Sequence, residues 1–423
     1  MKPYQVLVFI VCVMALLGVL YWAFPDVKLL TVNRNTEYSV QSTDTVIPEL
    51  LDTVIPEYRD TVIPEAPAAP KIIIPKVNVD STTDSRIFLS SFYASLAETG
   101  ERKVRVMHYG DSQIEEDRIT QQIREALQAQ YGGKGVGLMP LAQTIPTLTV
   151  KQELHMSGRF VNPSQGPRRY MVYSYKRDQR ADGLYGPMGQ MAEMNDSLVS
   201  GSEDIMAVVH PLQKNTLYER WRVFADSSVH YTLSGDTVRL KGRGNVYALS
   251  QESRTGVIVD NIPMRGCIGL VFNKMDREQL TSFYREQNVR LIILQFGGNA
   301  IPFNEKPTTI AAIVTGLRQQ VRYLRECAPE ASILFIGPSD MLTQTDGEWI
   351  TYPMVPYMDR LLRKMALEEN IAYFSLYRWM GGAGSMQHWQ EIGLAGSDGV
   401  HFNRAGARKA GRAIGEWILS GTY

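Results

Sequence analysis

Four short runs of this 423-residue sequence are apolar at most positions, and helical spacing follows each of them. The runs occupy residues 104–109, 289–296, 332–337 and 371–376. Strands that are apolar on both faces are typical of a parallel sheet, because helices cover both of those faces. The helices that we predict occupy residues 113–131, 308–327, 357–370 and 403–419. This alternation predicts an α/β domain in which a parallel sheet lies between two layers of helices.

The segment between the first and second of these runs has a different pattern. Residues 147–256 contain short runs of alternating apolar and polar side chains, such as TLTVKQEL and RWRVFA, separated by turn residues. A period of two is typical of strands with one buried face. We therefore predict an all-β module of sandwich type at residues 147–256, inserted into an α/β domain formed by residues 81–146 and 257–423.

The N-terminus contains 19 consecutive uncharged and mostly apolar residues, 6–24, a length that can span a bilayer. A cleaved signal peptide needs small residues at its cleavage site, whereas this run contains bulky Tyr21 and Trp22 near its end. We predict an uncleaved membrane anchor at residues 1–24, and a cleaved signal remains the alternative. The short positive segment around Lys2 then places most of the chain outside the cytoplasm.

The motif DTVIPE occurs three times with a period of eight residues and is followed by APAAPKIIIPK. A repeat of eight residues is too short to bury a core, and each proline removes a backbone donor. Residues 25–80 are therefore predicted to form an extended, proline-rich linker. A docking sequence for a partner is the alternative interpretation of this repeat.

The charge balance bears on the partners of the chain. Its 44 Lys and Arg residues match 44 Asp and Glu residues, so the sequence lacks the basic excess that is typical of nucleic-acid-binding proteins. The three cysteines, Cys12, Cys267 and Cys327, have no metal-binding spacing. We therefore predict no nucleic-acid partner, no metal site and no cofactor.

Polar groups follow the predicted strands at the edge of the sheet where reactive residues gather. Ser112 follows the first apolar run in a Gly-Asp-Ser turn, and Asn299 follows the second run after two glycines. Asp398 and His401 form an Asp-x-x-His pair before the last helix. A carboxylate at that spacing can hold one imidazole nitrogen and leave the other to accept a serine proton. Taken singly, Ser112 could instead cap a helix, Asn299 could be a turn residue and His401 an exposed loop residue.

In this order along the chain, the Gly-Asp-Ser, Gly-x-Asn and Asp-x-x-His motifs resemble those of the SGNH (GDSL) hydrolase family. The resemblance implies that Ser112 is the nucleophile, His401 the general base and Asp398 the residue that orients the base. It also implies an oxyanion hole formed by the Ser112 N–H, the Gly266 N–H and the Asn299 side chain. Gly266 is assigned this role because its segment, DNIPMRG, resembles the glycine block of the family.

Two positions depart from the family pattern. Gln113 follows the serine where the family name has leucine, and Ala300 stands where many members have an acid. Neither side chain performs the chemistry that the resemblance implies. Glu115, Glu116 and Asp117 fall in the first turns of the helix predicted to follow, where they are expected to be solvated.

A β module between the serine block and the glycine block is similar to that of the peptidoglycan O-acetylesterases of bacterial envelopes. This similarity implies a serine esterase that removes O-acetyl, or short acyl, groups from a cell-envelope glycan on the periplasmic side of the inner membrane. Trp389 would be available to stack on a sugar ring. The alternatives are an O-acyltransferase that uses the same residues on envelope glycans, and a glycan-binding protein without catalytic activity.

Overall fold

The computed structural model describes residues 84–143, 145–156, 159–161, 170–174, 186–194, 205–213, 216–302 and 304–422. The membrane anchor predicted at residues 1–24 and the linker predicted at 25–80 lie outside these described residues. Within the described ranges, no helix combines the length and the apolar character that crossing a membrane requires.

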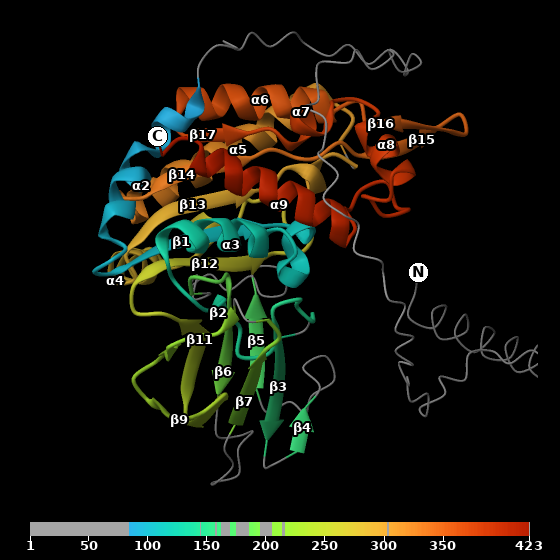
Figure 1. Ribbon diagram of the computed structural model, residues 1–423. Helices are drawn as coiled ribbons and strands as arrows, with labels where there is room; N and C mark the ends of the chain where they lie inside the picture. The colour runs from blue at the N-terminus through green and yellow to red at the C-terminus, as the bar shows by residue number, and fades with distance from the viewer. Residues whose placement is uncertain are drawn as a thin grey trace, which may run out of the picture. The chain divides into compact units, whose positions relative to one another are not determined.

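A five-stranded parallel sheet forms the centre of the α/β part (Figure 1). Its strands have the order β12-β1-β13-β14-β17, and every neighbouring pair is parallel. They are β1 (Lys103–Gly110), β12 (Gly256–Pro263), β13 (Val289–Gln295), β14 (Ser332–Ile336) and β17 (Ala372–Phe374). The predicted α/β fold with a parallel sheet is confirmed, and β12 is an edge strand in addition to the four predicted ones.

Helices cover both faces of this sheet (Figure 1). On one face lie α2 (Ser90–Ser95), α3 (Thr120–Tyr131) and α9 (Arg404–Leu419), and on the other α4 (Arg277–Glu286), α5 (Pro307–Cys327) and α6 (Val355–Glu368). Ile293 of β13 belongs to one buried cluster with Ile123 of α3, whereas its neighbour Ile292 belongs to another cluster with Leu317 of α5. Successive residues of β13 thus face opposite helix layers, which explains why the strand is apolar throughout.

Short elements connect these layers. The 3-10 turns are η1 (Ser85–Leu89), η2 (Leu96–Glu98), η3 (Ser112–Asp117), η5 (Phe272–Lys274) and η6 (Gly298–Ala300). A hairpin of β15 (Leu342–Thr345) and β16 (Glu348–Thr351) follows β14, and the short helices α7 (Leu376–Met380) and α8 (Ser385–Glu391) follow β17. The hairpin and the helices α7 and α8 were not predicted.

The chain between β1 and β12 forms antiparallel strands in two sheets. One sheet has the order β4-β3-β7-β10-β9, the other has the order β2-β11-β6-β5, and β8 also pairs with β11. The strands are β2 (Gly137–Met139), β3 (Val150–Met156), β4 (Arg159–Val161), β5 (Tyr170–Ser174), β6 (Gln190–Met194), β7 (Ile205–Pro211), β8 (Arg220–Ala225), β9 (Val229–Ser234), β10 (Thr237–Gly242) and β11 (Gly244–Glu252). Val150 and Val209 of the first sheet share a buried cluster with Leu249 of the second. β2 lies within residues 81–146, which we assigned to the α/β domain, yet it pairs with β11.

Buried ion pairs connect these antiparallel strands to the parallel sheet. Arg105 on β1 is fully buried and pairs with Glu252 on β11 and with Asp260 on β12. Lys103 lies 2.8 Å from Glu252, and the Leu138 N–H on β2 donates to Asp260 at 2.8 Å. Removing one partner from such a group would leave an uncompensated buried charge, which costs about 3–5 kcal/mol.

The helix predicted at residues 113–131 is wrong at its start. η3 occupies the first part of this range, and the α-helix begins only at Thr120. Glu116 and Asp117 have φ angles of 60° and 62°. These angles lie in the left-handed region, which a right-handed helix cannot contain. The chain therefore makes a compact turn directly after the Gly-Asp-Ser motif.

Tertiary contacts stabilise this turn, and they bury two acids that we expected to be solvated. The Asp117 carboxylate lies 2.6 Å from Arg124 and accepts the Thr149 hydroxyl at 2.9 Å. Glu115 accepts a hydrogen bond from Arg265 at 2.9 Å and is also buried. Charge pairing with residues outside the turn thus outweighs the helical propensity of the segment.

Candidate active site

The carboxyl end of the parallel sheet brings a serine and a histidine together from distant parts of the chain. Ser112 follows β1, and His401 lies in the loop before α9, 289 residues later. The Ser112 Oγ lies 2.8 Å from the His401 Nε2, and the His401 Nδ1 lies 2.7 Å from the Asp398 Oδ2. An ionised carboxylate only accepts hydrogen bonds, so Nδ1 carries a proton and Nε2 accepts from the Ser112 hydroxyl. The arrangement can therefore move a proton from Ser112 to His401.

The Asp398 carboxylate is held by its own loop. Its Oδ1 accepts the N–H groups of Val400 and His401, each at 2.9 Å, while its Oδ2 faces the imidazole. Partial burial acts to raise the pKa of Asp398, but the hydrogen bonds from His401 and Val400 together lower this pKa below its ordinary value. Asp398 is thus ionised at neutral pH, where it can stabilise a positive charge on the imidazole.

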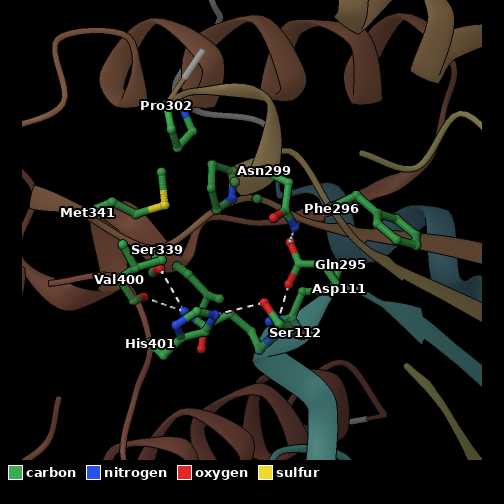
Figure 2. Close-up of a pocket in the computed structure, with 15 residues that line it drawn as sticks. Asp111, Ser112, Gln295, Phe296, Asn299, Pro302, Ser339, Met341, Val400 and His401 are labelled. Atoms are coloured by element: carbon green, nitrogen blue, oxygen red, sulfur yellow. Dashed lines mark hydrogen bonds between the residues drawn. The ribbon is translucent and has the colours of Figure 1, made fainter. Parts of the chain in front are cut away.

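Ser112 and His401 form part of the wall of an open cavity. Figure 2 shows the two side chains pointing toward one another, with Asn299 across the cavity and with Pro302 and Met341 along another side. The remaining lining residues are Asp111, Gln113, Gln295, Phe296, Gly298, Gly337, Pro338, Ser339, Leu376 and Val400. The reactive pair thus shares its cavity with the Asn299 side chain and with the apolar residues Pro302 and Met341.

Asn299 and Gly266 are placed differently with respect to this cavity. Asn299 lines it, and its side-chain amide donates to the Asp111 carboxylate at 3.1 Å and to the Cys267 carbonyl at 3.3 Å. Gly266 precedes Cys267 in a turn and has a φ angle of 71°, but it is not among the described residues that line the cavity. The structure therefore brings Asn299 into the site. Gly266 lies next to Cys267, the residue whose carbonyl accepts the Asn299 amide.

The sequence of this chain is also similar to that of a known protein family. The sequence model of the GDSL-like lipase/acylhydrolase family matches residues 196–409, which contain Gly266, Asn299, Asp398 and His401. The chain belongs to this family. It is accordingly a carboxylic ester hydrolase, as the resemblance implied. Ser112 lies outside the matched residues, so its place in the site rests on the contact with His401.

Solved structures extend the comparison beyond the matched residues. A structure described as a peptidoglycan O-acetylesterase superposes with a TM-score of 0.61 and 19% sequence identity, over 81% of this chain and 97% of that chain. Est24, a carbohydrate acetylesterase from Sinorhizobium meliloti, gives a TM-score of 0.29 at 15% identity and covers 39% of this chain and 79% of its own. A search of curated protein sequences finds no match. The first similarity establishes a shared fold over most of the hydrolase.

Arg118 is a residue of the site that the sequence analysis missed. Its guanidinium donates to the Ser112 carbonyl at 2.7 Å, to the Gln113 carbonyl at 3.1 Å and to the Phe402 carbonyl at 3.2 Å. It thereby connects the serine turn of the hydrolase to the residue that follows His401. No local pattern could have indicated this role, because Arg118 and Phe402 are 284 residues apart.

The prediction that Trp389 could stack on a sugar ring is wrong. Only 3% of its surface is exposed, and its ring lies 4.9 Å from that of Phe402 and 5.5 Å from that of Trp379, measured between centroids. Lys409 covers part of the same ring. The apolar face of α8 packs into the core, so Trp389 has no free ring face to offer a ligand.

His108 is a buried core residue of the hydrolase. Its Nδ1 lies 2.8 Å from the Thr120 hydroxyl and its Nε2 lies 3.2 Å from the Gln295 side-chain oxygen. Burial lowers the pKa of His108 to about 3, so the ring is neutral. Across the part of the chain that the structure describes, no group of three or more His, Cys, Asp or Glu side chains is placed to hold a metal ion.

Asp111 gives the hydrolase a stability that depends on pH. Burial raises the pKa of Asp111 to about 6, against the opposing effect of hydrogen bonds from the Gln113 N–H and the Asn299 amide. The folded state therefore binds the proton of this carboxyl more tightly than the unfolded chain, where the pKa is 3.8. The resulting stabilisation is complete below about pH 4 and is lost as the pH rises through about 6.

Replacing Asp111 by asparagine should remove this dependence. Between pH 4 and pH 7, the Asp111 carboxyl should lower the unfolding free energy of the wild type by up to about 3 kcal/mol, as the size of its pKa shift implies. D111N should lack this contribution. Urea denaturation of both proteins at the two pH values measures the effect. An identical pH dependence in D111N would contradict the prediction.

Proposed function

We propose that this hydrolase removes O-acetyl groups from a cell-envelope glycan, with Ser112 as the nucleophile. The observation that carries the proposal is the 2.8 Å contact between the Ser112 Oγ and the His401 Nε2. His401 takes the proton as the hydroxyl attacks the acetyl carbonyl, and Asp398 stabilises the imidazolium. His401 then returns the proton to the sugar oxygen that leaves. Water attacks the acyl-enzyme by the same route and releases acetate.

The negative oxygen of the intermediate needs hydrogen-bond donors about 2.7–3.1 Å from the position that it will occupy. We assign the Ser112 N–H and the Asn299 side chain to this role, and the Gly266 N–H as a third donor. Asn299 supports the assignment because it lines the same cavity as Ser112. Its amide would exchange the 3.3 Å hydrogen bond to the Cys267 carbonyl for one to the oxyanion.

Two observations support a short acyl group on a glycan. Pro302 and Met341 line the cavity that contains the reactive pair and offer an apolar surface for an acetyl methyl group (Figure 2). The similarity to a peptidoglycan O-acetylesterase covers 81% of this chain, so it includes antiparallel strands as well as the α/β part. We propose peptidoglycan as the glycan and a carbohydrate-binding role for the antiparallel strands.

Acetate release tests this function directly. The full chain should release acetate from O-acetylated peptidoglycan and should hydrolyse a two-carbon aryl ester at least about tenfold faster than an eight-carbon one, because the longer chain extends beyond the apolar wall. S112A is the matched inactive control. No acetate from the polymer, or a preference for the longer ester, would reject the substrate. Acetyl transfer to an added acceptor glycan in place of release would identify an acyltransferase.

We further propose that the hydrolase is anchored in the membrane and acts on the periplasmic side. The support is the run of 19 apolar residues at positions 6–24 together with the proline-rich stretch at 25–80 that would separate it from the catalytic part. Fractionation of cells that express the full chain should recover the acetate-releasing activity with the membranes. Activity that is recovered entirely in the soluble fraction would reject the anchor.

A further inference from the structure

Gln113 is the residue that departs from the leucine of the family name, and its side chain reaches the loop that carries His401. The Gln113 Nε2 donates to the Val400 carbonyl at 2.7 Å, and its Oε1 accepts the Phe402 N–H at 3.3 Å. Val400 and Phe402 are the two chain neighbours of His401. One carboxamide thus contacts the backbone on both sides of the histidine. We propose that Gln113 is a positioning residue that fixes His401 against Ser112, an inference that rests on the proposed function.

The chemistry of the contacts suits a carboxamide in one orientation. The Gln113 Nε2 donates to two acceptors, the Val400 carbonyl and the Ser339 Oγ, the latter at 3.3 Å. The Gln113 Oε1 accepts from a backbone N–H, that of Phe402. A glutamate of the same shape would keep the acceptor but would place a carboxylate oxygen against the Val400 carbonyl. A leucine would provide neither a donor nor an acceptor. Only 8% of the Gln113 surface is exposed, so water could replace these bonds only in part.

Asp398 cannot fix the position of the His401 loop relative to Ser112. Its hydrogen bonds go to Val400 and His401 of its own loop, so it orients the imidazole within the loop. The position of the loop relative to Ser112 depends on contacts between the two segments. Gln113 provides two of them, and Arg118 provides another through the Phe402 carbonyl. Losing the Gln113 contacts should therefore move the base relative to the nucleophile and leave the imidazole paired with Asp398.

Two substitutions test the proposal on a soluble two-carbon aryl ester. A misplacement of about 1 Å between reacting groups can cost about 100-fold in rate, so we expect Q113L and Q113E to lower kcat by about 10–100-fold. KM should stay within about twofold, because the cavity keeps its other walls. The rate of labelling by a serine-directed phosphonate should fall in proportion to kcat. The pH profile of Q113L should keep its shape, because the Asp398–His401 pair is intact, with the rate lowered by the same factor throughout.

Gln320 on α5 offers a matched control. Only 3% of its surface is exposed, and its side-chain oxygen accepts the Asn273 N–H at 3.0 Å, so it also binds the backbone of another segment. Q320L should keep the wild-type kcat. Active-site titration with the phosphonate corrects every rate for the fraction of folded protein, and Q113E, which has the shape of the wild type, serves if Q113L does not fold.

The possible outcomes separate the inference from the proposed function. Wild-type kcat in Q113L or Q113E, with S112A inactive, would overturn the positioning role and leave the proposed function intact. A lower melting temperature with an unchanged kcat per titrated site would overturn it equally, since it shows a structural role alone. Full activity in S112A would instead reject the proposed function and this inference with it.

Discussion

Replacing Ser112 by alanine should lower the rate of ester hydrolysis by about 10⁴–10⁶-fold, the loss found when the nucleophile of a serine hydrolase is removed. The substitution deletes one oxygen atom, and the described contact of that atom is to the His401 Nε2 at 2.8 Å. Alanine cannot form an acyl-enzyme, so the oxyanion donors and the cavity have no covalent intermediate to stabilise. The folded structure should remain, because the deleted hydroxyl connects no elements other than the serine turn and the histidine loop.

Hydrolysis of a soluble aryl ester and labelling by a serine-directed phosphonate measure this effect together. The wild type should be labelled at Ser112, and S112A should not be labelled. Ser385 provides a matched control, because it is also buried at the start of a short helix and its hydroxyl donates to the Gly382 carbonyl at 2.6 Å. S385A should retain wild-type turnover. Activity in S112A, or phosphonate found on Ser385, would remove Ser112 from the mechanism.

The histidine and the aspartate should differ in the size of their effects. H401A should lose as much activity as S112A, about 10⁴–10⁶-fold, because nothing then removes the hydroxyl proton. D398N should lose less, up to about 10⁴-fold, because the imidazole is still present but is held less well and its positive charge is no longer stabilised. The asparagine amide also donates where the carboxylate accepted, which favours the wrong tautomer of His401.

Steady-state rates of the two variants and the wild type on one soluble ester measure this order. The chain contains a matched pair in α8, where the His388 Nδ1 lies 3.7 Å from the Glu391 Oε2 at the same spacing of three residues. H388A and E391Q should leave kcat unchanged. Equal activity of D398N and the wild type would show that the carboxylate does not support the base.

The sequence was sufficient to predict the parallel sheet because its inner strands are buried on both faces. β13 and β14 read as continuous apolar runs, since one helix layer meets each side of them. β12 was not recognised, because its sequence GVIVDNIP follows directly on the last antiparallel strand and has no helix before it. Its parallel pairing with β1 joins residues about 150 positions apart, which no local pattern indicates.

The candidate site was predictable to the extent that its chemistry is local. Asp398 and His401 lie on one loop, so their spacing in the sequence already implies their contact. The prediction for Trp389 was wrong, because the local sequence around an aromatic residue does not show whether its face of the helix is exposed or buried. The contacts of Gln113 and Arg118 could not be predicted from the sequence for another reason. Both side chains bind backbone atoms close to His401, and backbone atoms carry no signal in the sequence.

The buried pairing of Arg105 with Glu252 and Asp260 has a consequence for any attempt to produce the catalytic part alone. Glu252 belongs to the last antiparallel strand, whereas Arg105 and Asp260 belong to the parallel sheet. Excision of the antiparallel strands would leave the guanidinium with one of its two counter-charges. Leu138, whose N–H binds the Asp260 carboxylate, lies outside residues 147–256 and would stay, but its strand β2 would lose its partner β11. A minimal catalytic fragment therefore cannot be obtained at the apparent sequence boundaries, and modular exchange of the antiparallel strands requires this charge cluster to be transplanted with them.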